Sequence, residues 1–355
     1  SFYALVKLTG DPVYAVAKAY ALRSQLLPFP VIEELADSKS LTEFVERLRA
    51  SPYGPYLGQL QKPYTAIELE KAFWRHLITE HHSLAETSLT PQLLRQYFMR
   101  YVYSNVKTIL KGKALGKPVD DIMKSIDLYA ETLLGVRDQA LRALGAKTLT
   151  EAVKEFTKTE LASAVSTAIN LWETKRDYSA VDAVVDKMYL EGLLHAYRET
   201  PASQRKEMTP FVSMDVDGYA LTTVLRSRVW GLMPVQAKDF LPSQTIMIGR
   251  EALDILLTAE DLGKALEDLP KPEFLSKISL EGSPSTLAAQ IEENVKRNKL
   301  RYASKSFYKT PFKQAVLISY VILKEAEVKN LATIAKNIEE GVTDPNVIQR
   351  LLLNY

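Results

Sequence analysis

The sequence contains no cysteine, and this absence removes several kinds of chemistry at once. Without thiols the chain forms no disulfide, no thiolate metal site and no cysteine nucleophile. Glycine is scarce as well, with 14 in 355 residues, where an average protein has about 7%. The scarcity of glycine favours a chain of long regular elements over one rich in tight turns.

Long apolar runs are also missing. No stretch approaches the roughly 20 apolar residues that a helix needs to cross a bilayer. The longest candidate, Ala315 to Leu323, is short and is followed by Lys324 and Glu325. The first seven residues lack the charged region and long apolar core of a signal peptide. We therefore expect no transmembrane segment, so that any work at a membrane is done from its surface or through a partner.

A large excess of charge of either sign is absent too, because 45 basic and 43 acidic residues give a formal net charge of +2. This balance gives no global signature of nucleic-acid binding, and we expect no nucleic-acid partner. A hydrophobic content of 46% is that of a soluble globular protein. A chain of 355 residues has room for two or three domains, or for one domain of repeated units.

The apolar residues that are present recur with a helical period. The clearest series steps by three or four residues and comprises Leu94, Phe98, Val102, Val106 and Ile109. Such a series forms one apolar stripe on a helix. Asp11-Pro12 predicts the start of a helix towards Leu27, and Thr65 with Glu68 predicts another. With no hairpin and no strand–helix alternation, the sequence predicts an all-α fold of about nine to twelve helices.

Two motifs recur in the same order along the chain. The first is a capping box, in which a hydroxyl and a carboxylate three residues later satisfy free backbone amides at a helix start. The three capping boxes are Ser40/Glu43, Thr148/Glu151 and Thr258/Asp261, and the residues after the third box are shifted by about three positions. The second motif is a long helix whose basic residue stands five positions before a glycine. These pairs are Lys111/Gly116, Arg226/Gly231 and Lys336/Gly341.

Positive charge and a left-handed glycine are both favourable where a helix ends. The two motifs therefore divide the chain into three units of about 110 residues, at residues 1–135, 136–247 and 248–355. Units of this size are small helical bundles rather than solenoid repeats, and three of them can close around a pseudo-threefold axis. The alternative is chance, since capping boxes and apolar steps are common in any all-α chain.

Two segments resemble a known family, the C subunit (called d in eukaryotes) of archaeal and vacuolar-type rotary ATPases. The segment from Tyr14 to Leu27 resembles the opening helix of that family, with its tyrosine, small-residue and Arg-x-x-Leu-Leu pattern. Residues 324–334, followed by Gly341, resemble the family's acidic-x-x-Asn-Leu-x-x-Ile block. Glu327 and Asn330 supply the acid and the amide of this block.

The other two repeats keep only half of that pair. Repeat one has Asn105 but Val102 in place of the acid, and repeat two has Asp217 but Ala220 in place of the amide. Only Glu327 with Asn330 matches fully. We predict that these two side chains act inside the fold, because one helical turn separates them on the best-patterned helix.

The resemblance implies a funnel-like array of three similar helical bundles. It implies a non-catalytic subunit that joins the central rotor shaft to the membrane proteolipid ring and passes torque between them during ATP-coupled proton or sodium transport. It places the protein on the cytoplasmic face of the membrane, as a peripheral component. It implies no catalytic residues, no cofactor and no metal in this subunit.

Near-matches to active-site motifs agree with that expectation. His76, Glu80 and His81 are spaced His-x-x-x-Glu-His, one residue away from a zinc-protease motif, and we interpret them as a solvated helix end. Residues 112–118 resemble a phosphate loop but have one residue too few between the glycines, and a proline replaces the Ser/Thr that would hold magnesium.

The most informative charge feature is a basic segment from Lys296 to Lys313, which contains no acid and is interleaved with aromatic residues. Its seven cations are Lys296, Arg297, Lys299, Arg301, Lys305, Lys309 and Lys313. Three interpretations stay open: a solvated helix face, a surface for a protein partner, or a single-stranded nucleic-acid site. Our candidate partner-binding residues are Lys296, Arg297, Lys299, Arg301, Lys305, Lys111 and Arg226. Two other functions also remain, an unrelated helical adaptor and a helical enzyme whose site lacks a known motif.

Overall fold

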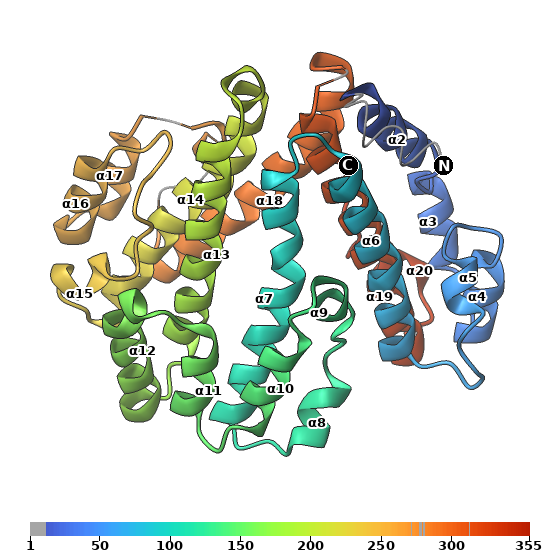
Figure 1. The fold of residues 1–355 in the computed structure, drawn as a ribbon, viewed down its shortest axis with the longest axis horizontal. Helices are drawn as coiled ribbons and strands as arrows, with labels where there is room; N and C mark the ends of the chain where they lie inside the picture. The colour runs from blue at the N-terminus through green and yellow to red at the C-terminus, as the bar shows by residue number, and fades with distance from the viewer. Residues whose placement is uncertain (1–11, 271, 277–278, 280, 312) are drawn as a thin grey trace. The chain divides into compact units, whose positions relative to one another are not determined.

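The computed structural model describes residues 12–270, 272–276, 279, 281–311 and 313–355. Every regular element in this part of the chain is a helix, so the predicted all-α class is confirmed (Figure 1). The helices run from α2 to α20, more than predicted, because single-turn helices such as α5 (Gly54–Leu57) are too short to show a period. The predicted cap at Asp11 and the N-terminal residues judged for a signal peptide lie outside the described residues.

The chain forms two compact units. Unit 1 joins both ends of the chain, residues 1–95 and 300–355, whereas unit 2 comprises residues 96–299. The boundaries fall inside two continuous helices, α7 (Gln92–Ala114) and α18 (Pro284–Lys309). The three predicted repeats follow the order of the sequence, whereas the two units follow the packing, so the repeats stay a prediction.

Unit 1 is built around α19 (Ala315–Glu339), which is buried along most of its length. The apolar stretch Ala315 to Leu323 lies in this helix, and α19 packs against α6 beside it (Figure 1). Helices α2, α3 and α4 also contact α19, so the last long helix forms the core for the first part of the chain. Besides α19, the helices of this unit are α2 (Pro12–Ser24), α3 (Phe29–Leu35), α4 (Leu41–Leu48), α5, α6 (Ala66–Thr87) and α20 (Pro345–Gln349).

Unit 2 packs α12 against α13, α13 against α14, and α14 against α16. Its α-helices, besides the parts of α7 and α18 that it includes, are α8 (Val119–Lys124), α9 (Tyr129–Leu134), α10 (Arg137–Gly145), α11 (Leu149–Phe156), α12 (Ala162–Lys175), α13 (Ser179–Glu199), α14 (Ala202–Trp230), α15 (Pro234–Lys238), α16 (Arg250–Thr258) and α17 (Leu262–Glu267). Two 3-10 turns, Thr159–Leu161 and Glu273–Leu275, complete the set in the described residues.

Two of the three predicted capping boxes are confirmed, and one is wrong. Ser40 accepts a hydrogen bond from the Glu43 amide at 3.1 Å, and Thr148 accepts one from the Glu151 amide at 3.2 Å. Thr258 is instead the last residue of α16. Asp261 caps the following helix, α17, because its own carboxylate accepts from the amide three residues later. The predicted helix start at Thr65 is also confirmed.

The three predicted left-handed glycines are confirmed. Gly116, Gly231 and Gly341 have φ values of 66°, 70° and 82° and stand just after α7, α14 and α19. In each case the next residue donates its amide to the carbonyl five positions earlier, which is the closing bond of a Schellman motif. These bonds are Lys117 to Gly112 at 2.9 Å, Leu232 to Ser227 at 3.0 Å and Val342 to Asn337 at 3.0 Å.

Candidate functional site

The basic segment does not form one continuous charged face. Lys296 and Arg297 are exposed in unit 2, where Arg297 lies 3.6 Å from Glu293 on the preceding turn of α18. In unit 1, Lys305 is exposed. Arg301 is less exposed, being half-buried, and it makes further contacts. The helical period therefore distributes these cations over different faces and over both units.

Lys299 points into unit 2. Its ammonium lies 2.7 Å from the Asp215 carboxylate and 5.4 Å from the centre of the Tyr97 ring. Arg100 stacks on the same tyrosine, with its guanidinium carbon 3.5 Å from the ring centre. Burial lowers the pKa of Lys299, but the Asp215 charge outweighs this effect and keeps the pKa above its usual value. Lys299 is thus an internal ion-pair residue of unit 2 rather than an open contact point.

Lys111 and Arg226 occupy equivalent places at the ends of α7 and α14. Lys111 is exposed, whereas Arg226 is half-buried and pairs with Glu292 of α18. Both act on the same carboxyl group, Asp182 of α13. Burial raises the pKa of Asp182, and the positive charges of Lys107, Lys111 and Arg226 oppose that rise. The positive charges at both helix ends therefore act on the first turn of α13.

Glu327 lies in the core of unit 1, with 0% of its surface exposed. Its carboxylate accepts hydrogen bonds from the Leu27 amide at 2.6 Å, the Tyr53 hydroxyl at 2.6 Å and the Lys324 ammonium at 2.7 Å. A buried carboxylate is tolerated when a charge and several donors surround it. These contacts join α19 to the segment after α2 and to the residue before α5.

A second, half-buried carboxylate completes this polar cluster. Glu80 of α6 lies 2.6 Å from the His76 ring and accepts a hydrogen bond from the Tyr320 hydroxyl at 2.5 Å. Burial raises the pKa of Glu80, but His76 and the Lys324 charge outweigh it, so the pKa lies below its usual range. Lys324 itself is 2% exposed and stands 4.3 Å from the Tyr53 ring centre.

The solvated helix end predicted for the histidine cluster is wrong. His76 and His81 are both buried within α6, because this helix continues past them to Thr87 and packs along α19. His76 and Glu80 share one face, as the spacing predicted, and form the contact just described. The ring of His81 contacts the Leu94 carbonyl at 2.8 Å instead. In the part of the chain that the structure describes, no three His, Asp or Glu side chains gather as a metal site.

Asn330 lies one turn beyond Glu327 and is also buried. Its side-chain amide donates to the Leu353 carbonyl at 2.9 Å, and its side-chain oxygen accepts from the Leu353 amide at 2.7 Å. This pair of bonds holds the chain's last residues against α19. Sequence reasoning identified both Glu327 and Asn330 but missed Lys324 and Tyr53, although the spacing of Lys324 and Glu327 by three residues was a usable signal.

The same positions of the other two long helices make matching contacts. Asn105 of α7 donates to the Asp127 carbonyl at 2.9 Å, a residue 22 positions later, as Asn330 does to a carbonyl 23 positions later. Asp217 of α14 accepts from the Ile246 and Met247 amides, each at 2.8 Å. Each long helix therefore uses its amide or acid to hold an irregular segment that lies close to it.

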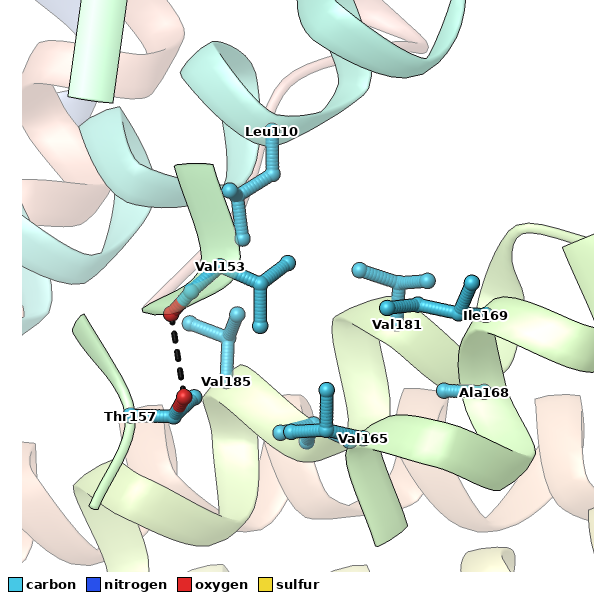
Figure 2. A pocket seen from close by; sticks show the side chains of 9 residues that line it. Leu110, Val153, Thr157, Val165, Ala168, Ile169, Val181 and Val185 are labelled. Carbon is cyan, nitrogen blue, oxygen red and sulfur yellow. Dashed lines mark hydrogen bonds between the residues drawn. The ribbon is translucent and has the colours of Figure 1, made fainter. Parts of the chain in front are cut away.

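Unit 2 contains a small apolar cavity of about 10 Å³ (Figure 2). Its walls come from α7, α11, α12, α13 and the residue after α11. Figure 2 shows Val153 and Thr157 side by side, where the Thr157 hydroxyl donates to the Val153 carbonyl at 3.0 Å. The lining residues are Leu110, Val153, Thr157, Val165, Ala168, Ile169, Val181, Val184 and Val185. A space of this size and polarity has room for no substrate.

The chain is similar to known proteins along nearly its whole length. Residues 15–350 match the model of the family described as ATP synthase (C/AC39) subunit. The C subunit of the A-type ATP synthase of Methanosarcina acetivorans is 24% identical over 98% of this chain and 94% of its own. The protein of the same name from Pyrococcus furiosus is 26% identical over 93% of this chain and 87% of its own. No helix in the described residues is long and apolar enough to cross a bilayer.

Proposed function

Because the chain belongs to the ATP synthase (C/AC39) subunit family, we propose that it couples the central shaft of a rotary ATPase to the proteolipid ring in the membrane. The chain is a non-catalytic subunit, as are its relatives, which are named as the C subunit of A-type ATP synthases. The observation that carries the proposal is the family match over residues 15–350, which leaves no separate domain for another activity within that range. Proton or sodium transport would be driven through torque that this subunit passes on.

The three repeats, residues 1–135, 136–247 and 248–355, are part of this proposal. Three Schellman bonds at equivalent glycines support them, and so do the matching contacts of Asn105 and Asn330. The buried acids add a further correspondence. Asp217 accepts from an amide 14 residues before the cap at Asp261, and Glu327 accepts from the Leu27 amide, 13 residues before the cap at Ser40.

This correspondence suggests a cyclic order of the repeats. Helix α14 holds the last residues of repeat two just before repeat three begins, and α19 holds the first repeat through Leu27. Such an order is what three bundles around a pseudo-threefold axis require, because the last bundle must close on the first. It also accounts for a compact unit made from both ends of the chain.

We place the protein on the cytoplasmic face of the membrane, bound to it through the proteolipid ring. The absence of a spanning helix from the described residues is consistent with attachment through partners. The candidate contact residues for the shaft are the basic segment and the helix ends at Lys111 and Arg226. Among these, Lys299 and Arg226 are engaged in internal ion pairs, so we expect the exposed cations to carry the contact.

The test is purification of the tagged protein from native membranes under mild detergent. The proposal requires the shaft subunits and the proteolipid to co-purify with the tagged protein in a fixed ratio. An unrelated helical adaptor would bring down other proteins and no rotor subunits, and this result would overturn the proposal. Calorimetric titration of the purified protein with ATP should show no saturable binding heat. Binding with a defined nucleotide stoichiometry would instead favour a helical enzyme.

A further inference from the structure

One exposed surface of unit 1 combines positive charge with a fixed aromatic side chain. We call it the Tyr308 patch, and its residues are Arg23, Lys305, Tyr308 and Lys309. Tyr308 is 71% exposed, which is unusual for a large aromatic side chain. Arg23 of α2 donates a hydrogen bond to its hydroxyl at 2.6 Å and stacks 4.8 Å from its ring centre. The tyrosine is therefore exposed and held in place at the same time.

The helix turn that carries Tyr308 is also fixed to α2. The Tyr20 hydroxyl donates to the Phe307 carbonyl at 2.9 Å, and the two rings meet edge to face at 5.2 Å. The Arg23 guanidinium lies 4.6 Å from the centre of the Phe307 ring as well. A side chain that is already ordered loses little entropy when a partner covers it. Rigid tyrosines and arginines are the residues that dominate binding energy in protein interfaces.

The lysines around Tyr308 are available for a partner. Lys305 and Lys309 are exposed, and neither forms an ion pair with a carboxylate of the described residues. Lys305, Tyr308 and Lys309 stand at positions i, i+3 and i+4, so they share one face of α18. A partner helix with acidic residues one turn apart would match this spacing.

We infer that the Tyr308 patch binds an acidic face of the coiled-coil shaft, with Tyr308 as the apolar anchor and the lysines as charge partners. This inference rests on the proposed function and names the surface that performs it. The patch fits a protein helix better than a lipid surface. Its one arginine is engaged with Tyr308, and among the described residues it offers a single aromatic side chain, whereas interfacial helices present a broad apolar face. The positions beside the apolar seam of a coiled coil are often glutamate or lysine, and such glutamates would face these lysines.

The inference is tested by measuring the affinity of the purified shaft subunit of the same complex for three variants. One carries Lys305→Glu with Lys309→Glu, and the second carries Tyr308→Ala. The third is a matched control, Lys154→Glu with Lys158→Glu, which reverses two exposed charges of unit 2 that are not among the candidate contact residues. Melting curves establish that each variant is folded.

We expect the first variant to bind at least about tenfold more weakly at low salt, with the difference shrinking in high salt as the charges are screened. Tyr308→Ala should lose about tenfold at both salt concentrations, because its contribution is mainly contact area. The control should stay within about threefold of wild type.

If wild-type protein binds the shaft and both patch variants bind equally well, the inference is overturned and the proposed function stands. If wild-type protein does not bind the shaft at all, the proposed function fails together with the inference. The last measurement is the binding of wild-type protein and of the variants to vesicles that contain anionic lipid. Loss of vesicle binding in the patch variants, with shaft binding unchanged, would assign the surface to the membrane and overturn the inference.

Discussion

Two buried carboxylates, Glu327 in unit 1 and Glu131 in unit 2, are stabilised by different kinds of hydrogen-bond partner. Glu327 is surrounded by a lysine, a tyrosine hydroxyl and a backbone amide. Glu131 of α9 is 1% exposed, and its side-chain partner is the Asn105 amide, at 2.9 Å. Burial raises the pKa of Glu131 to about 7, against which the Asn105 hydrogen bond acts only partly.

The two carboxylates are thus equally buried but differ in the charge of their partners. A lysine compensates a buried negative charge, whereas a neutral amide cannot do so fully. The polar cluster of unit 1 therefore depends on charge pairing, and the contact between Glu131 and Asn105 depends on pH. Substitutions in both units test this contrast.

The largest expected effect is that of Lys324→Met, which removes the charge beside Glu327. An uncompensated carboxylate would remain in the core, and we expect unfolding free energy to fall by about 3–5 kcal/mol. Urea denaturation of the purified protein measures it. The matched control is Lys329→Met on the same helix, whose half-exposed lysine pairs with Glu325 at 3.2 Å. The control should change stability by no more than about 0.5 kcal/mol, and equal losses in both variants would contradict the charge-pair account.

Next in size is the pH dependence contributed by Glu131. Its pKa is raised in the folded protein, so the folded state binds more protons than the unfolded state between the usual carboxyl pKa of 4.5 and about 7. Its contribution to stability is therefore lost as pH rises through that window, by about 3 kcal/mol at most, since one pKa unit corresponds to about 1.4 kcal/mol. Glu131→Gln should abolish this part of the profile and stabilise the protein at pH 8. An unchanged difference between pH 5 and pH 8 would refute it.

A smaller effect separates the two equivalent asparagines. Asn330→Ala removes two bonds to Leu353 and should lower stability by about 1–3 kcal/mol at every pH. Asn105→Ala removes the donor to Glu131, so its loss should grow from pH 5 to pH 8 as that carboxyl ionises. Melting temperatures at the two pH values distinguish the variants. Unchanged melting of Asn330→Ala combined with lost assembly would assign Asn330 to a partner contact instead.

The smallest effect is expected in the apolar cavity, where no charge is involved. Val165→Ile adds one methylene to a space of about 10 Å³ and should change stability by less than about 1 kcal/mol. The change should not depend on pH, which makes this variant a reference for the two asparagines. A loss above that limit would mean that the surrounding valines cannot move to admit the methylene.

Features set by neighbouring residues could be predicted from the sequence. Helix caps at Ser40 and Thr148, and left-handed glycines at Gly116 and Gly231, depend on contacts within one or two turns. Features set by distant residues could not. Glu327 meets the amide of Leu27, 300 residues away, and no local pattern encodes that contact.

The prediction that the cations of the basic segment share one surface was wrong for a related reason. Seven cations without an acid suggested a single solvated or binding surface, but Asp215 lies 84 residues from Lys299 and draws it inside unit 2. The histidine cluster was wrongly predicted to be a helix end because its residues are polar. The helix in fact continues to Thr87 and packs against α19, a contact that the local sequence does not encode. Arg23 was missed as a surface residue because its partner, Tyr308, lies at the other end of the chain.

The most direct test of the coupling role is ion transport by the rotary complex with and without this protein. Complexes depleted of the chain should still hydrolyse ATP, while ATP-driven ion uptake into vesicles falls to background and returns when the purified protein is added back. Full ion transport in the depleted complex, or no recovery by an added protein that rebinds the complex, would contradict the proposed coupling between shaft and ring.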